Sequence, residues 1–83
     1  MLTYFVVQSF QRTKRGILVA EPAIEARDRD HALRMAGRLV QIRAGVVAFS
    51  RSGDMSTGEY EDAVILYRAG DIVGLDDDIA IAS

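Results

Sequence analysis

Basic side chains are the residues of this 83-residue chain whose spacing best suits binding chemistry. Arg34 and Arg38 are four residues apart in a segment with helical periodicity, so both guanidinium groups share one helix face. Arg12, Lys14 and Arg15 crowd a short polar stretch nearer the N-terminus. Groups of arginines can hold an anion or follow a phosphate backbone. These five residues are therefore the candidate contacts for an anion or a partner.

Two features of the sequence oppose a nucleic-acid interpretation of this basic set. The net charge is −2, and no aromatic residue interleaves with these arginines to stack bases. The alternatives are an ordinary solvated surface or pairing with the acidic half of a second chain. Residues 1–45 carry a net charge of +4 and residues 46–83 carry −6, so two copies could complement each other.

The sequence gives little indication of a catalytic site. His31 would need an orienting partner to act as a general base, and a solvated surface histidine is the simpler interpretation. Nothing indicates that the carboxylates of Glu59, Glu61 and Asp62 converge, and no nucleophilic Ser or Cys stands in a recognisable turn. Because no residue set with a role for each member can be written, we expect a protein that is not an enzyme.

Gly53 and Gly58 have the spacing of a phosphate-binding loop, but the match is accidental. That motif continues with Lys and a hydroxyl residue, whereas Glu59 and Tyr60 follow here, and a carboxylate repels phosphate. Ser56 and Glu59 have capping-box spacing instead, which predicts a short helical turn over residues 59–62.

Metal and cofactor sites are not predicted. The chain has no cysteine and one histidine, so neither a disulfide nor a thiolate site is possible, and a zinc site would need unusual help from carboxylates. The acidic triplet Asp76–Asp78 lacks the alternation, glycine turn and distal glutamate of a calcium loop. We interpret residues 72–83 as an acidic, mobile tail and residues 1–71 as a single domain.

One helix is expected to position the Arg34 and Arg38 pair, over residues 28–45. Its apolar positions lie on one face, and Asp28 or Asp30 can cap its N-terminus while Gly45 offers a left-handed stop. The apolar face comprises Ala32, Leu33, Ala36, Leu39 and Val40, flanked by Met35 and Ile42.

Four strands are predicted around this helix. They cover residues 3–10, 16–21, 46–49 and 63–69, with a polar turn at 11–16 and a long loop at 50–62. Gly16 is available for a positive φ in the polar turn. Pro22 cannot donate to a ladder, so the second strand ends there or lies on an edge. A right-handed crossover through the helix gives an α+β, ββαββ fold. Its antiparallel sheet has order 2-1-3-4, a split βαβ with one helix on one face.

The size of this sheet predicts a homodimer. Four strands span close to 20 Å, whereas a helix with side chains is about 10 to 12 Å wide. The opposite face also receives apolar side chains, and leaving it wet would expose more apolar area than a soluble monomer usually shows. We therefore expect a two-fold dimer that buries sheet surface or pairs edge strands.

The chain starts in a strand-like segment and has no apolar run long enough to span a membrane, so we expect a cytoplasmic protein without a membrane anchor. The run GVVAFSRSGDMSTGEYEDAVILYRAGD, residues 45–71, resembles small uncharacterised bacterial proteins of similar length. This resemblance implies a bacterial source and no activity. The leading functional hypothesis is a small non-catalytic homodimer acting as an interaction or accessory protein. The alternative is an anion or nucleic-acid binding module that uses the basic set.

Overall fold

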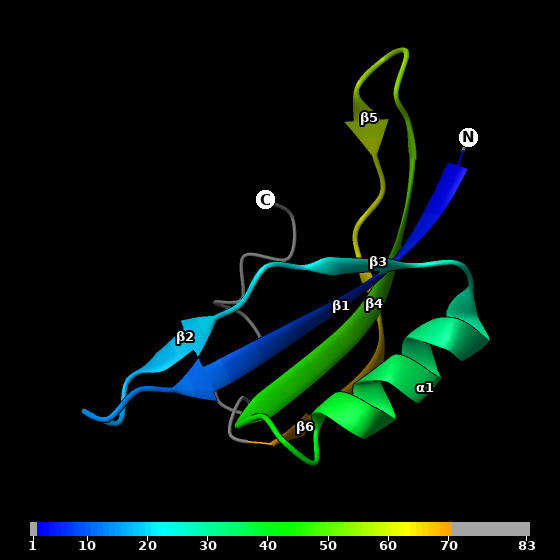
Figure 1. Cartoon of the computed structure of the whole chain (residues 1–83). Helices are drawn as coiled ribbons and strands as arrows, with labels where there is room; N and C mark the ends of the chain where they lie inside the picture. The colour runs from blue at the N-terminus through cyan, green and yellow to red at the C-terminus, as the bar shows by residue number, and fades with distance from the viewer. Residues whose placement is uncertain (1, 71–83) are drawn as a thin grey trace.

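The computed structural model describes residues 2–70, which form one helix and a mostly antiparallel sheet (Figure 1). The elements in chain order are β1 (Leu2–Arg12), β2 (Leu18–Ala20), β3 (Ile24–Ala26), α1 (Arg29–Leu39), β4 (Gly45–Asp54), β5 (Glu59–Tyr60) and β6 (Val64–Gly70). The predicted α+β class is confirmed. The predicted acidic tail, residues 72–83, lies outside the described residues.

Six strands replace the four predicted ones because the two outer strands are interrupted. β1 and β4 form the centre and pair over nine residues, from Leu2 opposite Gly53 to Phe10 opposite Gly45. β2 and β3 both pair with β1, while β5 and β6 both pair with β4. The three predicted strand pairings are present as β2–β1, β1–β4 and β4–β6, but the predicted number of strands is wrong, because β3 and β5 also belong to the sheet.

Pro22 explains the interruption on the β1 side. β2 ends at Ala20 and pairing resumes only at β3, where Ile24 lies opposite Val7. Phe10 lies opposite Ala20, so the register between β1 and its outer partner shifts by one residue across this break. A proline without an amide hydrogen fits such a bulge at a sheet edge. β3 and β4 are each antiparallel to β1, which lies between them, and this makes β3–α1–β4 a split βαβ around β1.

The helix is shorter than predicted. It begins after Asp28, whose side chain accepts a hydrogen bond from the His31 amide at 2.8 Å, and ends at Leu39 with Val40 as its C-cap. Gly45 is the first residue of β4 and not the helix stop. The Ala44 amide donates to the Phe10 carbonyl at 2.9 Å. This residue therefore pairs with β1 and cannot continue the helix. Ile42, expected on the flank of the helix, lies in the following turn and is 68% exposed.

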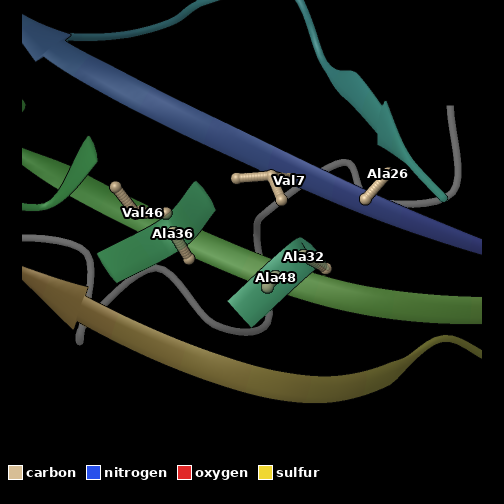
Figure 2. Close-up of a cluster of buried hydrophobic side chains, with 6 residues drawn as sticks. All are labelled: Val7, Ala26, Ala32, Ala36, Val46 and Ala48. Atoms are coloured by element: carbon tan, nitrogen blue, oxygen red, sulfur yellow. The ribbon is translucent and has the colours of Figure 1, made fainter. Parts of the chain in front are cut away.

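Small side chains build the core between α1 and the sheet. Ala32 and Ala36 of the helix lie over β1 and β4, beside Val7 and Val46 (Figure 2). Alanine on the contact face lets a helix approach a sheet closely, so a single short helix can cover the two central strands. Phe5, Met35, Leu39, Val40, Leu66 and Tyr67 pack around this cluster.

The other face of the sheet also has a small core within the chain, whereas a second copy was expected to cover this face. Phe10 and Val47 are buried there against Leu18, and Phe49 is only 5% exposed. The largest exposed apolar side chains lie instead at strand edges, in turns and at the hairpin end. They are Leu2, Ile17, Val19, Ile24, Ile42, Met55, Tyr60, Val64 and Ile65. The centre of this face is therefore not the exposed apolar surface from which a dimer was predicted.

Candidate functional site

The predicted basic set is divided between two places. Arg34 and Arg38 lie exposed on the outer face of α1. Lys14 and Arg15 lie exposed in the turn between β1 and β2, which Figure 1 shows at the far end of the sheet from the N-terminus of α1. The fold therefore does not gather the five residues into one surface.

The β1–β2 turn holds its basic residues by local backbone bonds. The Gly16 amide donates to the Thr13 carbonyl at 2.9 Å, and Gly16 takes a φ of +82°, the positive value expected from the sequence. Arg12 donates through Nη1 to the Gly16 carbonyl at 2.7 Å, so this guanidinium braces the turn. Lys14 and Arg15 make no side-chain hydrogen bond or ion pair within residues 2–70.

The two arginines on the outer face of α1 are exposed to solvent. Neither Arg34 nor Arg38 has a hydrogen-bonding or ion-pair partner in the part of the chain that the structure describes. Arg34 does act electrostatically on Asp28, the residue that caps the helix. The backbone hydrogen bond from His31 lowers the pKa of Asp28, and the charges of Arg27 and Arg34 lower this pKa further. His31 Nδ1 accepts a hydrogen bond from the Arg27 amide at 3.0 Å, so the imidazole binds the backbone just before the helix begins.

A polar network around Glu21 is a feature that sequence reasoning missed. Glu21 Oε1 accepts from the Ser9 hydroxyl at 2.6 Å and from Arg43 Nε at 2.6 Å, and Gln11 donates to Oε2. Hydrogen bonds from Ser9, then Gln11 and Arg43, hold the pKa of Glu21 below its ordinary value. Gln8 donates to the Glu21 carbonyl beside Pro22.

This network is structural in its chemistry. A carboxylate with a lowered pKa is a poor proton acceptor. Ser9 is only 4% exposed, and its hydroxyl donates its proton in a hydrogen bond to Glu21. The network joins β1, the break before Pro22 and the loop between α1 and β4. It therefore fixes the bulge where the outer strand is interrupted.

The carboxylates of residues 46–70 lie at and just beyond the β4–β5 hairpin. Asp54 Oδ1 accepts from the Ser56 hydroxyl at 2.6 Å and from the Ser56 amide at 2.9 Å, and the hydroxyl bond is the main cause of a lowered pKa at Asp54. The helical turn predicted over residues 59–62 is wrong. Glu59 and Tyr60 form β5, and Gly58 takes a φ of +76° to close the hairpin. Ser56 thus bonds Asp54 and does not cap a helix.

An arginine between two tyrosines lies on the helix-free face at this hairpin. Arg51 is directly opposite Tyr4 in the β1–β4 register, and its guanidinium carbon lies 5.6 Å from the centre of the Tyr60 ring. Arg51 was not in the predicted basic set, and it lies beside an aromatic ring. Residues 4, 51 and 60 have no common periodicity in the sequence, so only strand pairing could reveal the group.

Neither a metal-binding cluster nor a membrane-spanning helix is present in residues 2–70. Within residues 2–70 no three His, Cys, Asp or Glu side chains gather as a metal site. In the same range no helix is long and apolar enough to cross a membrane.

Comparison with protein-family models, with curated proteins and with solved structures gives no match for this chain. The resemblance of residues 45–71 to small bacterial proteins accordingly stays a prediction, and the function has to be argued from the geometry alone.

Proposed function

We propose that this chain is a small non-catalytic interaction protein that forms a homodimer through strand β6. The observation that carries the proposal is the exposure of two consecutive apolar residues of this strand, Val64 at 58% and Ile65 at 41%. Within residues 2–70, β6 pairs only with β4, so one edge of β6 is a template for another strand.

The length and composition of β6 favour pairing of its free edge with a strand of another chain. Natural edge strands avoid association by being short or by carrying charges, prolines and bulges. β6 has seven residues, VILYRAG, with Arg68 as its one charged side chain. It has one irregularity, because its register with β4 shifts at Leu66, between Ile65 opposite Phe49 and Tyr67 opposite Ala48. The other edge of the sheet is protected, because β2 and β3 have three residues each and the Pro22 break separates them. A second copy of β6, antiparallel about a two-fold axis, suits such an edge.

The chemistry of the polar groups supports a role through contacts rather than catalysis. Ser9 and Glu21 belong to the structural network at the Pro22 break, and Asp54 is occupied by Ser56. His31 accepts a backbone amide at the start of α1. Each of these groups already has a partner that explains its position, and none lies beside a second group with a complementary catalytic role.

Sedimentation of the purified chain tests the homodimer. We expect a mass of twice 9.1 kDa at micromolar concentration. Ile65→Lys should shift the mass to that of the monomer, because a charge on the pairing strand opposes association. Ile42→Lys is the matched control, since Ile42 is as apolar, is more exposed and lies outside the sheet. A wild-type mass of 9.1 kDa throughout the micromolar range would contradict the proposal.

The outer face of α1 supports a second candidate, the binding of a polyanion. Arg34 and Arg38 are exposed, one turn apart, and without a hydrogen-bonding or ion-pair partner within residues 2–70. Combined Arg34→Ala and Arg38→Ala should abolish a salt-sensitive gel shift with duplex DNA or RNA. Combined Lys14→Ala and Arg15→Ala is the comparison, because this pair lies in the β1–β2 turn. The absence of any shift with the wild type at low salt would exclude this candidate.

A further inference from the structure

The β4–β5 hairpin extends beyond the rest of the molecule, and the N-terminal part of β1 runs beside it (Figure 1). β4 reaches Asp54 and returns through β5, while α1 covers the middle of the sheet. Side chains at this end of the sheet therefore have no helix above them. The chemistry of this surface is set by the residues that the strand register places on each side of it.

The strand register separates the charges of the hairpin by face. Val7 and Ala48 lie opposite each other and pack under α1, so Tyr4 and Arg51, also opposite each other, lie on the helix-free face. By the same alternation, Asp54 and Glu59, which pair with each other, lie on the helix side. The arginine is thus on one face of the hairpin and these two carboxylates are on the other.

The ring of Tyr60 is fixed on the helix-free face by Gly53. A Cβ atom at Gly53 would come within 2.0 Å of Tyr60 Cδ1, so the ring occupies the place that a side chain would take. Tyr60 is nevertheless 45% exposed. One part of the ring therefore rests on the backbone while the remainder is open, an arrangement that limits the entropy lost when a second planar group stacks on it.

Arg51 is held beside this ring. Its Nε donates to the Glu61 carbonyl at 3.2 Å, and its guanidinium carbon is 5.6 Å from the ring centre, within the range of a cation–π contact. A guanidinium between two tyrosines can stack on a base through its plane and bond a phosphate through its edge.

We infer that Tyr4, Arg51 and Tyr60 form a binding site for single-stranded nucleic acid on the helix-free face of the β4–β5 hairpin. The tyrosine rings stack on bases and Arg51 neutralises the adjoining phosphate. Bases of a duplex already stack on each other, so the site favours a single strand over a duplex. The site is distinct from the β6 edge and from the outer face of α1, and it requires neither a dimer nor Arg34 and Arg38.

Fluorescence anisotropy with labelled oligouridine and a matched RNA duplex tests this site. We expect the single strand to bind more tightly than the duplex. Tyr60→Leu, which still covers Gly53 but has no π face, should weaken single-strand binding about ten-fold or more, whereas Tyr60→Phe should retain it. Arg51→Gln should weaken binding, while Arg34→Gln, which removes the same charge from α1, should change it by less than about two-fold.

Three outcomes would overturn the inference. They are no binding of oligouridine by the wild type, equal loss in Tyr60→Leu and Tyr60→Phe, or equal loss in Arg51→Gln and Arg34→Gln. Circular dichroism verifies the fold of each variant. If Tyr60→Leu disturbs the hairpin, Tyr4→Leu on the neighbouring strand provides the same comparison, with Tyr4→Phe as its control. Retained binding by Tyr4→Leu in that case would also contradict the site.

Discussion

Tyr60 of β5 lies directly opposite Gly53 of β4, and its ring fills the space that a Cβ atom of residue 53 would occupy. Gly53 is buried by this ring although it belongs to a projecting hairpin. The pair explains why a glycine is used in the middle of a strand, a position where it is otherwise unfavourable. An aromatic ring over a strand glycine stabilises the cross-strand register.

Replacement of Gly53 should therefore destabilise the hairpin. Gly53→Ala places a methyl group against the Tyr60 ring, and we expect a loss of about 1 to 2 kcal/mol in the free energy of unfolding. Chemical denaturation measures this loss. In a Tyr60→Ala background the methyl group has room, so Gly53→Ala should cost less there, and equal costs in both backgrounds would contradict the steric explanation.

Val46 and Val47 test whether the sheet has a core on both faces. Both side chains are fully buried, Val46 under α1 and Val47 beside Phe10 on the helix-free face. We expect Val46→Ala and Val47→Ala each to lower the free energy of unfolding by about 2 kcal/mol. Val64→Ala, at an exposed position of β6, is the control and should change it by less than about 0.5 kcal/mol in the monomer. A negligible effect of Val47→Ala would show that the second face contributes little.

Glu21 should make the stability of the folded chain depend on pH. Its pKa in the folded chain is below the ordinary value of 4.5, so the folded state binds this proton less readily than the unfolded state does. The stabilisation is complete above that ordinary value and is lost as the pH falls from there through the folded pKa. Unfolding midpoints between neutral and strongly acidic pH measure the loss.

Glu21→Gln is the variant that isolates this contribution. We expect it to be less stable than the wild type at neutral pH and to approach the wild type as the pH falls below about 4. Glu25→Gln provides a control, because it removes a carboxylate from the adjoining strand and leaves the Ser9, Gln11 and Arg43 contacts intact. A constant difference between Glu21→Gln and the wild type at every pH would contradict the assignment.

Asp28 is expected to be the residue that starts the helix. Its carboxylate accepts the His31 amide, a donor that the helix itself cannot satisfy. Asp28→Ala should lower the thermal midpoint, whereas Asp28→Asn, which keeps an accepting oxygen, should lower it less. Asp30→Ala serves as the comparison, since Asp30 lies in the first turn without a capping bond in the described chain. A larger effect at Asp30 than at Asp28 would contradict this assignment.

Local patterns in the sequence determined the α+β class, the choice of Asp28 or Asp30 as the N-cap, the apolar face of the helix and a glycine at position 16 that can take a positive φ. The structure selects Asp28 as the N-cap. These features depend on residues within one or two turns of each other, so their periodicity and conformational preferences are visible in the linear chain. The end of the helix was not visible in this way. It is set by the pairing of Gly45 with Phe10, a contact between distant segments.

Only the tertiary structure decided where the side chains of the candidate sites meet. Strand register joins Tyr4 to Arg51 and Gly53 to Tyr60, and the bulge at Pro22 directs Glu21 toward Ser9 and Arg43. The separation of Lys14 and Arg15 from Arg34 and Arg38 has the same origin. A shift of one residue in pairing reverses the face of every side chain in a strand, and the linear sequence of an outer strand does not reveal where such a shift occurs.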